Sequence, residues 1–237
     1  MSDVLGSSPD TMPAARSQAG DRHLTSTRPV TTSAVGVTFV DVLFALVIAQ
    51  VLTPFADTRA LPWVGRVQLI LAGFLTVASW IGYHNSWNRP KYFIRFPNWP
   101  LAQFLIDVLL VVVYFLCAIT APGVQARTNP DRSIIAIIVL VALSFTLYAA
   151  WDWVSLQIRK GAGYALRTEE RDIPARRRVS YCFAILGWLF VVGVWYFKPD
   201  TSFPAISIEV SLIALIICYR FVKEYVTPPS VSMDEVS

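Results

Sequence analysis

Long apolar runs, separated by short stretches of charged and turn-forming residues, fill the chain from about residue 35 to residue 222. The runs cover residues 35–55, 67–83, 99–121, 133–154, 179–197 and 204–222. Each holds roughly 17–23 residues, enough for an α-helix rising ~1.5 Å per residue to cross ~30 Å of hydrocarbon. No run alternates apolar and polar residues as a strand does, so a β-barrel is not expected. The pattern predicts an all-α, polytopic membrane protein with six transmembrane helices.

The two ends of the chain differ from this apolar middle. Residues 1–34 are rich in Ser, Thr, Pro and Gly and contain no apolar run, so they are not a cleavable signal peptide. Residues 223–237 form a second, shorter polar stretch. The expected organisation is a disordered cytosolic leader (1–34), a six-span transmembrane domain (35–222) and a cytosolic C-terminal tail (223–237).

Charged residues are few and unevenly distributed. Hydrophobic residues make up 55% of the 237 residues and charged residues 15%, against about 25% charged in a soluble domain. Of the 20 Lys and Arg, 15 fall on one side of the predicted spans, which the positive-inside rule makes the cytoplasmic side, with both termini. The basic run Arg176, Arg177 and Arg178 is therefore interpreted as a topology determinant or an anionic-lipid contact. No nucleic-acid partner is expected.

Residues that carry enzymatic chemistry are scarce. The chain has two His and three Cys, and Cys117, Cys182 and Cys218 lie inside apolar runs without paired spacing. Metal-ligand spacings, a Gly-rich phosphate loop and a nucleophile elbow are all missing from the sequence. We therefore expect no enzymatic activity, no cofactor and no metal site.

Four carboxylates fall within or at the rim of the predicted spans: Asp41, Asp107, Asp152 and Glu209. An ionised acid that faces lipid costs about 2.5–3.5 kcal/mol or more, so these side chains should face protein, water or a partner. Asp152, which stands between two Trp residues, is expected to be an interfacial residue. For Asp107 and Glu209 the sequence predicts no partner.

Asp41 and His84 fall at similar depths on the first and second spans, near the predicted cytoplasmic side. Consecutive helices usually pack together, so a hydrogen bond to the Asp41 carboxylate from His84 or Asn85 is expected. Two interpretations stay open. The pair is either a clasp between two helices or a proton-sensing pair, since His titrates near neutral pH.

The first two spans also carry two short sequence patterns. They are Thr38-Phe39-Val40-Asp41, followed by an apolar run to Leu52-Thr53-Pro54, and Trp80-Ile81-Gly82-Tyr83-His84-Asn85. Together they resemble the first two helices of the transmembrane protein 175 family of potassium channels. In that family a Phe-Ser-Asp signature opens the first helix, and Trp followed by two His or near equivalents closes the second. Because Val40 replaces the Ser and Tyr83 one His, the chain resembles a divergent member.

This resemblance implies a homotetrameric, potassium-permeable channel in a cell membrane, that of a bacterium. Potassium or another monovalent cation would pass through a pore lined by the first helix of each copy. The family's constriction of branched apolar side chains would fall, by position, at Leu46. The signature network between the first two helices would comprise Phe39, Asp41, Trp80, His84 and Asn85.

Helix geometry divides the first span into two faces. Leu46, Gln50 and Thr53 recur at i, i+4 and i+7 and share one stripe, whereas Asp41 points ~140° away from Leu46. If Leu46 faces a pore, Gln50 and Thr53 line its outer mouth and Asp41 turns toward His84. A ring of Leu side chains would gate such a pore by dewetting. The alternative is that Leu46 packs inside the helix bundle and Gln50 bonds to a neighbouring helix.

Three functional hypotheses follow. The first is the channel. The second is a secondary transporter, with proton coupling as one form of it, because Asp107 and Glu209 lie in separate spans. The third is a non-conducting membrane subunit that recruits a cytosolic partner through the basic connection 159–178.

Overall fold

The computed structural model describes residues 32–57, 61–85, 98–121, 130–161, 172–197 and 202–226. They form α1 (Thr32–Leu52), η1 (Thr53–Asp57), α2 (Trp63–Asn85), α3 (Trp99–Thr120), α5 (Pro130–Gly161), α6 (Asp172–Phe197) and α7 (Ser202–Val226), and no strand occurs among them. Six of these helices are long and apolar enough to cross a membrane. The prediction of an all-α, multi-pass membrane protein is confirmed to that extent. The side on which the termini lie stays a prediction.

Several helices extend beyond the predicted apolar runs into charged sequence. α5 continues to Gly161 and α6 begins at Asp172, so Arg176 and its basic neighbours belong to a helix and not to a connection. α7 runs to Val226, and Lys223, expected in the C-terminal tail, is instead buried on this helix. A hydropathy pattern identifies the part of a helix that can lie in lipid. It does not identify further helical turns that are stabilised by contacts of polar side chains.

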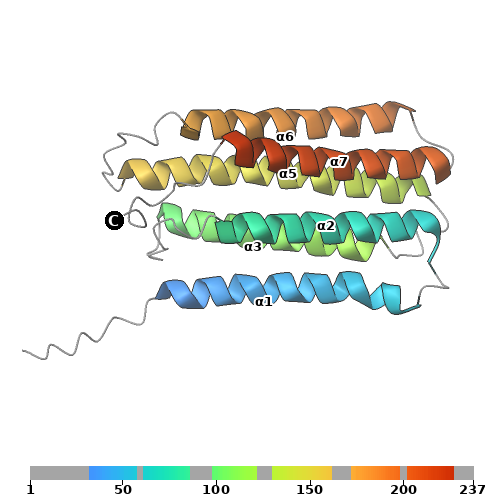
Figure 1. Cartoon of the computed structure of the whole chain (residues 1–237), viewed down its shortest axis with the longest axis horizontal. Helices are drawn as coiled ribbons and strands as arrows, with labels where there is room; N and C mark the ends of the chain where they lie inside the picture. Colours follow the sequence, from blue (N-terminus) through green and yellow to red (C-terminus); the bar gives the residue numbers. More distant parts are fainter. Residues whose placement is uncertain are drawn as a thin grey trace, which may run out of the picture. The chain divides into compact units, whose positions relative to one another are not determined.

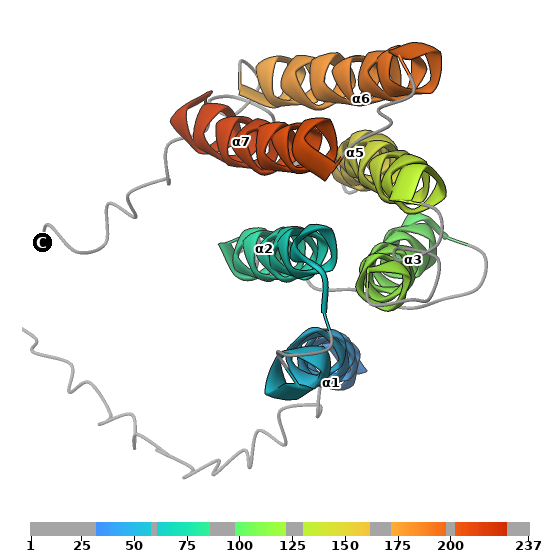
Figure 2. The same ribbon diagram turned by 90° about the vertical axis from the view of Figure 1, so that its right-hand side faces the viewer.

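Consecutive helices run in opposite directions (Figure 1). α1 packs against α2 and α3, α3 packs against α5, and α2 packs against α7. α6 packs against α5 and α7. Seen along the helices, α1 and α6 lie on opposite sides of the other four (Figure 2). At one end of the bundle α2, α5 and α7 finish and α6 starts. We call it the basic end, after the Arg and Lys residues described below.

The two outer helices present different surfaces. On α1 the buried residues Val40, Phe44, Val47 and Val51 follow one helical stripe and join the core shared with α2 and α3. On α6 a wide apolar face is exposed, and it includes Ile185, Leu186, Leu189, Val192 and Trp195. Such a face is typical of a helix that meets lipid.

Candidate functional site

The carboxylate of Asp41 on α1 meets two ring nitrogens of α2. Nε1 of Trp80 donates a hydrogen bond of 3.2 Å to Oδ1 of Asp41, and Nε2 of His84 lies 3.7 Å from the same oxygen. Trp80 and His84 stand one helical turn apart, with their ring centroids separated by 4.4 Å. Nδ1 of His84 lies 3.2 Å from the carbonyl oxygen of Trp80. These contacts connect α1 to α2 through one carboxylate.

The chain's own helices leave this cluster partly open. The side chain of Asp41 is 37% exposed and that of His84 is 33% exposed. Phe39 and Trp80 are exposed beside them. A carboxylate in a membrane span that is left to lipid costs about 2.5–3.5 kcal/mol or more. The carboxylate therefore needs water or protein beyond the described residues on its open side.

The predicted signature residues divide into two groups. Asp41, Trp80 and His84 come together, whereas Phe39 turns to α3, where its ring centroid lies 6.1 Å from that of Phe104. The side chain of Asn85 lies outside the described residues. Whether these residues act as a clasp or as a proton sensor stays a prediction.

The predicted pore residues lie on the outward side of α1. Leu46 is 59% exposed, so it does not pack inside the bundle that this single chain's described helices form. Gln50 is half-buried and forms no hydrogen bond with another helix among the described residues. Thr53 is exposed, and its Oγ1 donates a 2.7 Å hydrogen bond to the carbonyl of Ala49 on the preceding turn. A pore role for the stripe stays a prediction.

Asp107, for which the sequence predicted no partner, is buried on α3 beside α2. It acts electrostatically on the hydroxyl of Tyr83 on α2, as does Asp41 more weakly. The ring of Phe44 lies near Tyr83, with 6.3 Å between centroids. Asp41, Tyr83 and Asp107 thus belong to three helices that pack against one another, α1, α2 and α3.

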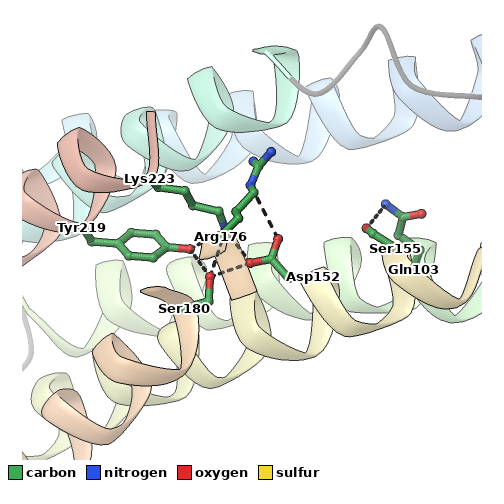
Figure 3. Close-up of polar contacts among 7 residues, drawn as sticks. All are labelled: Gln103, Asp152, Ser155, Arg176, Ser180, Tyr219 and Lys223. Atoms are coloured by element: carbon green, nitrogen blue, oxygen red, sulfur yellow. Dashed lines mark hydrogen bonds and ion pairs between the residues drawn. The ribbon is translucent and has the colours of Figure 1, made fainter. Parts of the chain in front are cut away.

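Asp152 is not the interfacial residue that its Trp neighbours suggested. It is buried between α5, α6 and α7, and its Oδ2 accepts hydrogen bonds from Nζ of Lys223 at 2.8 Å and from Oγ of Ser180 at 2.5 Å (Figure 3). Nε of Arg176 lies 3.9 Å from Oδ1. Neighbouring helical residues point about 100° apart, so Asp152 faces inward while Trp153 is exposed.

Lys223 completes this buried group. Besides the Asp152 carboxylate, its Nζ bonds to Oγ of Ser180 at 3.1 Å and to the hydroxyl of Tyr219 at 2.7 Å. Ser180 and Tyr219 also lie within hydrogen-bonding distance of one another, at 3.2 Å. An ammonium has three protons to donate, and three acceptors surround it here.

Tyr148 of α5 joins the buried group to α2 and α3. Its hydroxyl forms hydrogen bonds with the hydroxyl of Tyr114, at 2.7 Å, and with Oγ of Ser79. Its ring stacks on that of Tyr219, with centroids 5.4 Å apart. The guanidinium carbon of Arg220 lies 5.7 Å from the same ring. Four helices therefore meet around one aromatic side chain.

Glu209 lies fully buried on α7, toward the end of the bundle opposite the basic end. The side chain of Gln68 on α2, also fully buried, is its polar neighbour, but neither carboxylate oxygen of Glu209 accepts a hydrogen bond from the described residues. Sequence reasoning found no partner because α2 and α7 are distant in the chain. Polar residues inside apolar runs, such as Ser180 and Gln68, were the available signal for both buried groups.

Comparison of the chain with protein-family models, with curated proteins and with solved structures finds no match. The likeness to the potassium-channel family accordingly stays a prediction made from two helices. Within the part of the chain that the structure describes, no group of three or more His, Cys, Asp and Glu side chains is placed to hold a metal ion.

Proposed function

We propose that this chain is one subunit of a homo-oligomeric membrane channel for monovalent cations, potassium among them, with α1 lining the pore. The observation that carries the proposal is the division of α1 into two faces. Its buried valines and Phe44 hold it to α2 and α3, while Leu46 is exposed, Gln50 is half-buried on the same stripe, and Thr53 follows exposed at the start of η1. Polar side chains on the outward side of a spanning helix need water or protein beside them.

The contrast with α6 supports this assignment. The outward face of α6 is a broad apolar surface, which suits lipid, whereas α1 carries the half-buried amide of Gln50, and the exposed hydroxyl of Thr53 follows it in η1. The partly exposed pair Asp41 and His84 lies where α1 meets α2. A second copy packed against these helices would cover the pair. Four copies are expected from the resemblance.

Leu46 would form the narrowest part of the pore. A ring of Leu side chains around an axis excludes water when it is tight and admits hydrated ions when it widens. Asp41 would not line this pore, because its carboxylate is directed at α2. The pore would instead present Gln50 and Thr53 on one side of the ring.

The test is cation flux into proteoliposomes for Leu46→Ala and Leu52→Ala. Both leucines are 59% exposed on α1, but they point about 120° apart around the helix. We expect Leu46→Ala to raise potassium flux several-fold, because the smaller side chain widens the ring, and Leu52→Ala to leave it unchanged. Equal effects of the two substitutions, or unchanged flux in Leu46→Ala, would contradict a constriction at Leu46.

A further inference from the structure

Three basic side chains and one carboxylate gather at the basic end, between α5, α6 and α7. Asp152 and Lys223 neutralise one another across 2.8 Å. Nε of Arg176 lies 3.9 Å from Oδ1 of Asp152. The guanidinium carbon of Arg220 and Nζ of Lys223 lie 5.7 and 5.9 Å from the ring centroid of Tyr148, so both arginines lie close to this pair. The group therefore carries two positive charges beyond those that Asp152 balances.

Among the described residues, Arg176 has one long ion pair and Arg220 has none with a carboxylate. Arg176 approaches Asp152 only through Nε, and its terminal nitrogens point away from the carboxylate (Figure 3). Arg220 lies over the ring of Tyr148 and packs its guanidinium against Gly82 of α2. Among the described residues it forms no ion pair with a carboxylate.

We propose that Arg176 and Arg220 bind the phosphate group of an anionic phospholipid at the basic end. A guanidinium presents planar, paired donors that fit two phosphate oxygens, and uncompensated charge strengthens the attraction. Basic sites between transmembrane helices are suited to such headgroups. This inference does not rest on the proposed channel, because a lipid site requires no conduction.

The position of the two arginines favours a lipid over a free anion. The membrane-crossing parts of α6 and α7 are Ala175–Phe197 and Phe203–Tyr225, so Arg176 lies at the very start of one and Arg220 near the end of the other. Long basic side chains near the ends of a span extend their charged groups to the headgroup level. Exposed apolar side chains continue from there along α6, beginning with Tyr181 and Ile185, and offer a surface to acyl chains.

The experiment measures lipid binding to the purified full chain in detergent by native mass spectrometry, with phosphatidylglycerol, phosphatidylcholine and inorganic phosphate as probes. We expect phosphatidylglycerol to bind at least about tenfold more tightly than phosphatidylcholine. Inorganic phosphate at the same concentration should not compete for the site. Equal binding of the two lipids would overturn the proposal, and full competition by inorganic phosphate would replace it with a free-anion site.

Substitutions locate the site. Arg176→Gln and Arg220→Gln should each weaken phosphatidylglycerol binding about tenfold, whereas Arg178→Gln, which removes an exposed charge from the same turn of α6, should not. Gly82→Ala leaves the charge unchanged but puts a Cβ where the Arg220 guanidinium lies, so it should weaken binding as well. An equal loss in Arg178→Gln, or full binding in both Arg220→Gln and Gly82→Ala, would show diffuse surface attraction and overturn the assignment.

Discussion

At the scale of single residues, Asp152 and Lys223 form a buried ion pair between α5 and α7. Both side chains are at most 7% exposed, and the pair also forms hydrogen bonds with the hydroxyl groups of Ser180 and Tyr219. Removing one partner of a buried pair leaves an uncompensated charge and costs about 3–5 kcal/mol, whereas replacing both is often close to neutral. The pair therefore fixes α5 against α7 without being a large net source of stability.

Asp152→Asn should lower the free energy of unfolding by about 3–5 kcal/mol, because the buried side chain of Lys223 then loses the carboxylate that compensates its charge. The double variant Asp152→Asn, Lys223→Met should recover most of this loss. Denaturant unfolding in detergent measures both, with Glu224→Gln, an exposed neighbour of Lys223, as the control. A double variant that is less stable than Asp152→Asn alone would contradict the conclusion that Asp152 and Lys223 form a buried ion pair.

The two carboxylate partnerships differ in how far the sequence could predict them. Asp41 and His84 lie on consecutive helices, so topology alone indicated that they could meet, and they lie 3.7 Å apart. Asp152 and Lys223 are 71 residues apart on non-consecutive helices. Hydropathy also placed Lys223 outside the last span, because a hydropathy scale gives a lysine the same polar value whether it is buried in an ion pair or exposed to water.

At the scale of helices, α5 and α6 approach one another closely at Gly187. A Cβ on Gly187 would stand 3.2 Å from Cα of Ala142 and 3.3 Å from the ring of Phe145. On the same helix, a Cβ on Gly193 would meet nothing within 4 Å. The missing side chain at Gly187 thus sets the distance between the two helices, while the one at Gly193 does not.

Ala at these two positions should act in opposite directions. Gly193→Ala should keep or raise stability by up to about 1 kcal/mol, because Ala favours the helix. Gly187→Ala should be about 1–3 kcal/mol less stable than Gly193→Ala, since the backbone of α5 must move to admit the methyl group. The comparison uses the same denaturant unfolding, and equal stabilities would show that α5 and α6 do not pack through Gly187.

The number and order of the helices could be predicted from the apolar runs, because burial in lipid imposes a length of about 20 residues on each span. The residues at which the helices begin and end could not be predicted from the apolar runs. The last turns of α5 and the first turns of α6 carry charged residues, and Asp152, Ser180 and Arg176 come together there. Tertiary contacts stabilise these turns, and a hydropathy pattern along one chain contains no record of such contacts.

At the scale of the whole molecule, polar groups are distributed unequally between its two outer helices. α6 offers lipid an apolar face and carries Arg176 at its membrane boundary. α1 carries Leu46 and Gln50 on its outward side, and the half-exposed Asp41 and His84 lie where it meets α2. This asymmetry favours an assembly in which α1 faces other copies and α6 faces lipid.

The most direct measurement is the reversal potential of the reconstituted protein in a planar bilayer, with potassium on one side and sodium on the other. A cation channel lined by α1 predicts a current that reverses at a potential shifted toward the potassium equilibrium value. Folded protein, reconstituted in either orientation, that carries no current would contradict the central claim that the chain forms a cation-conducting pore.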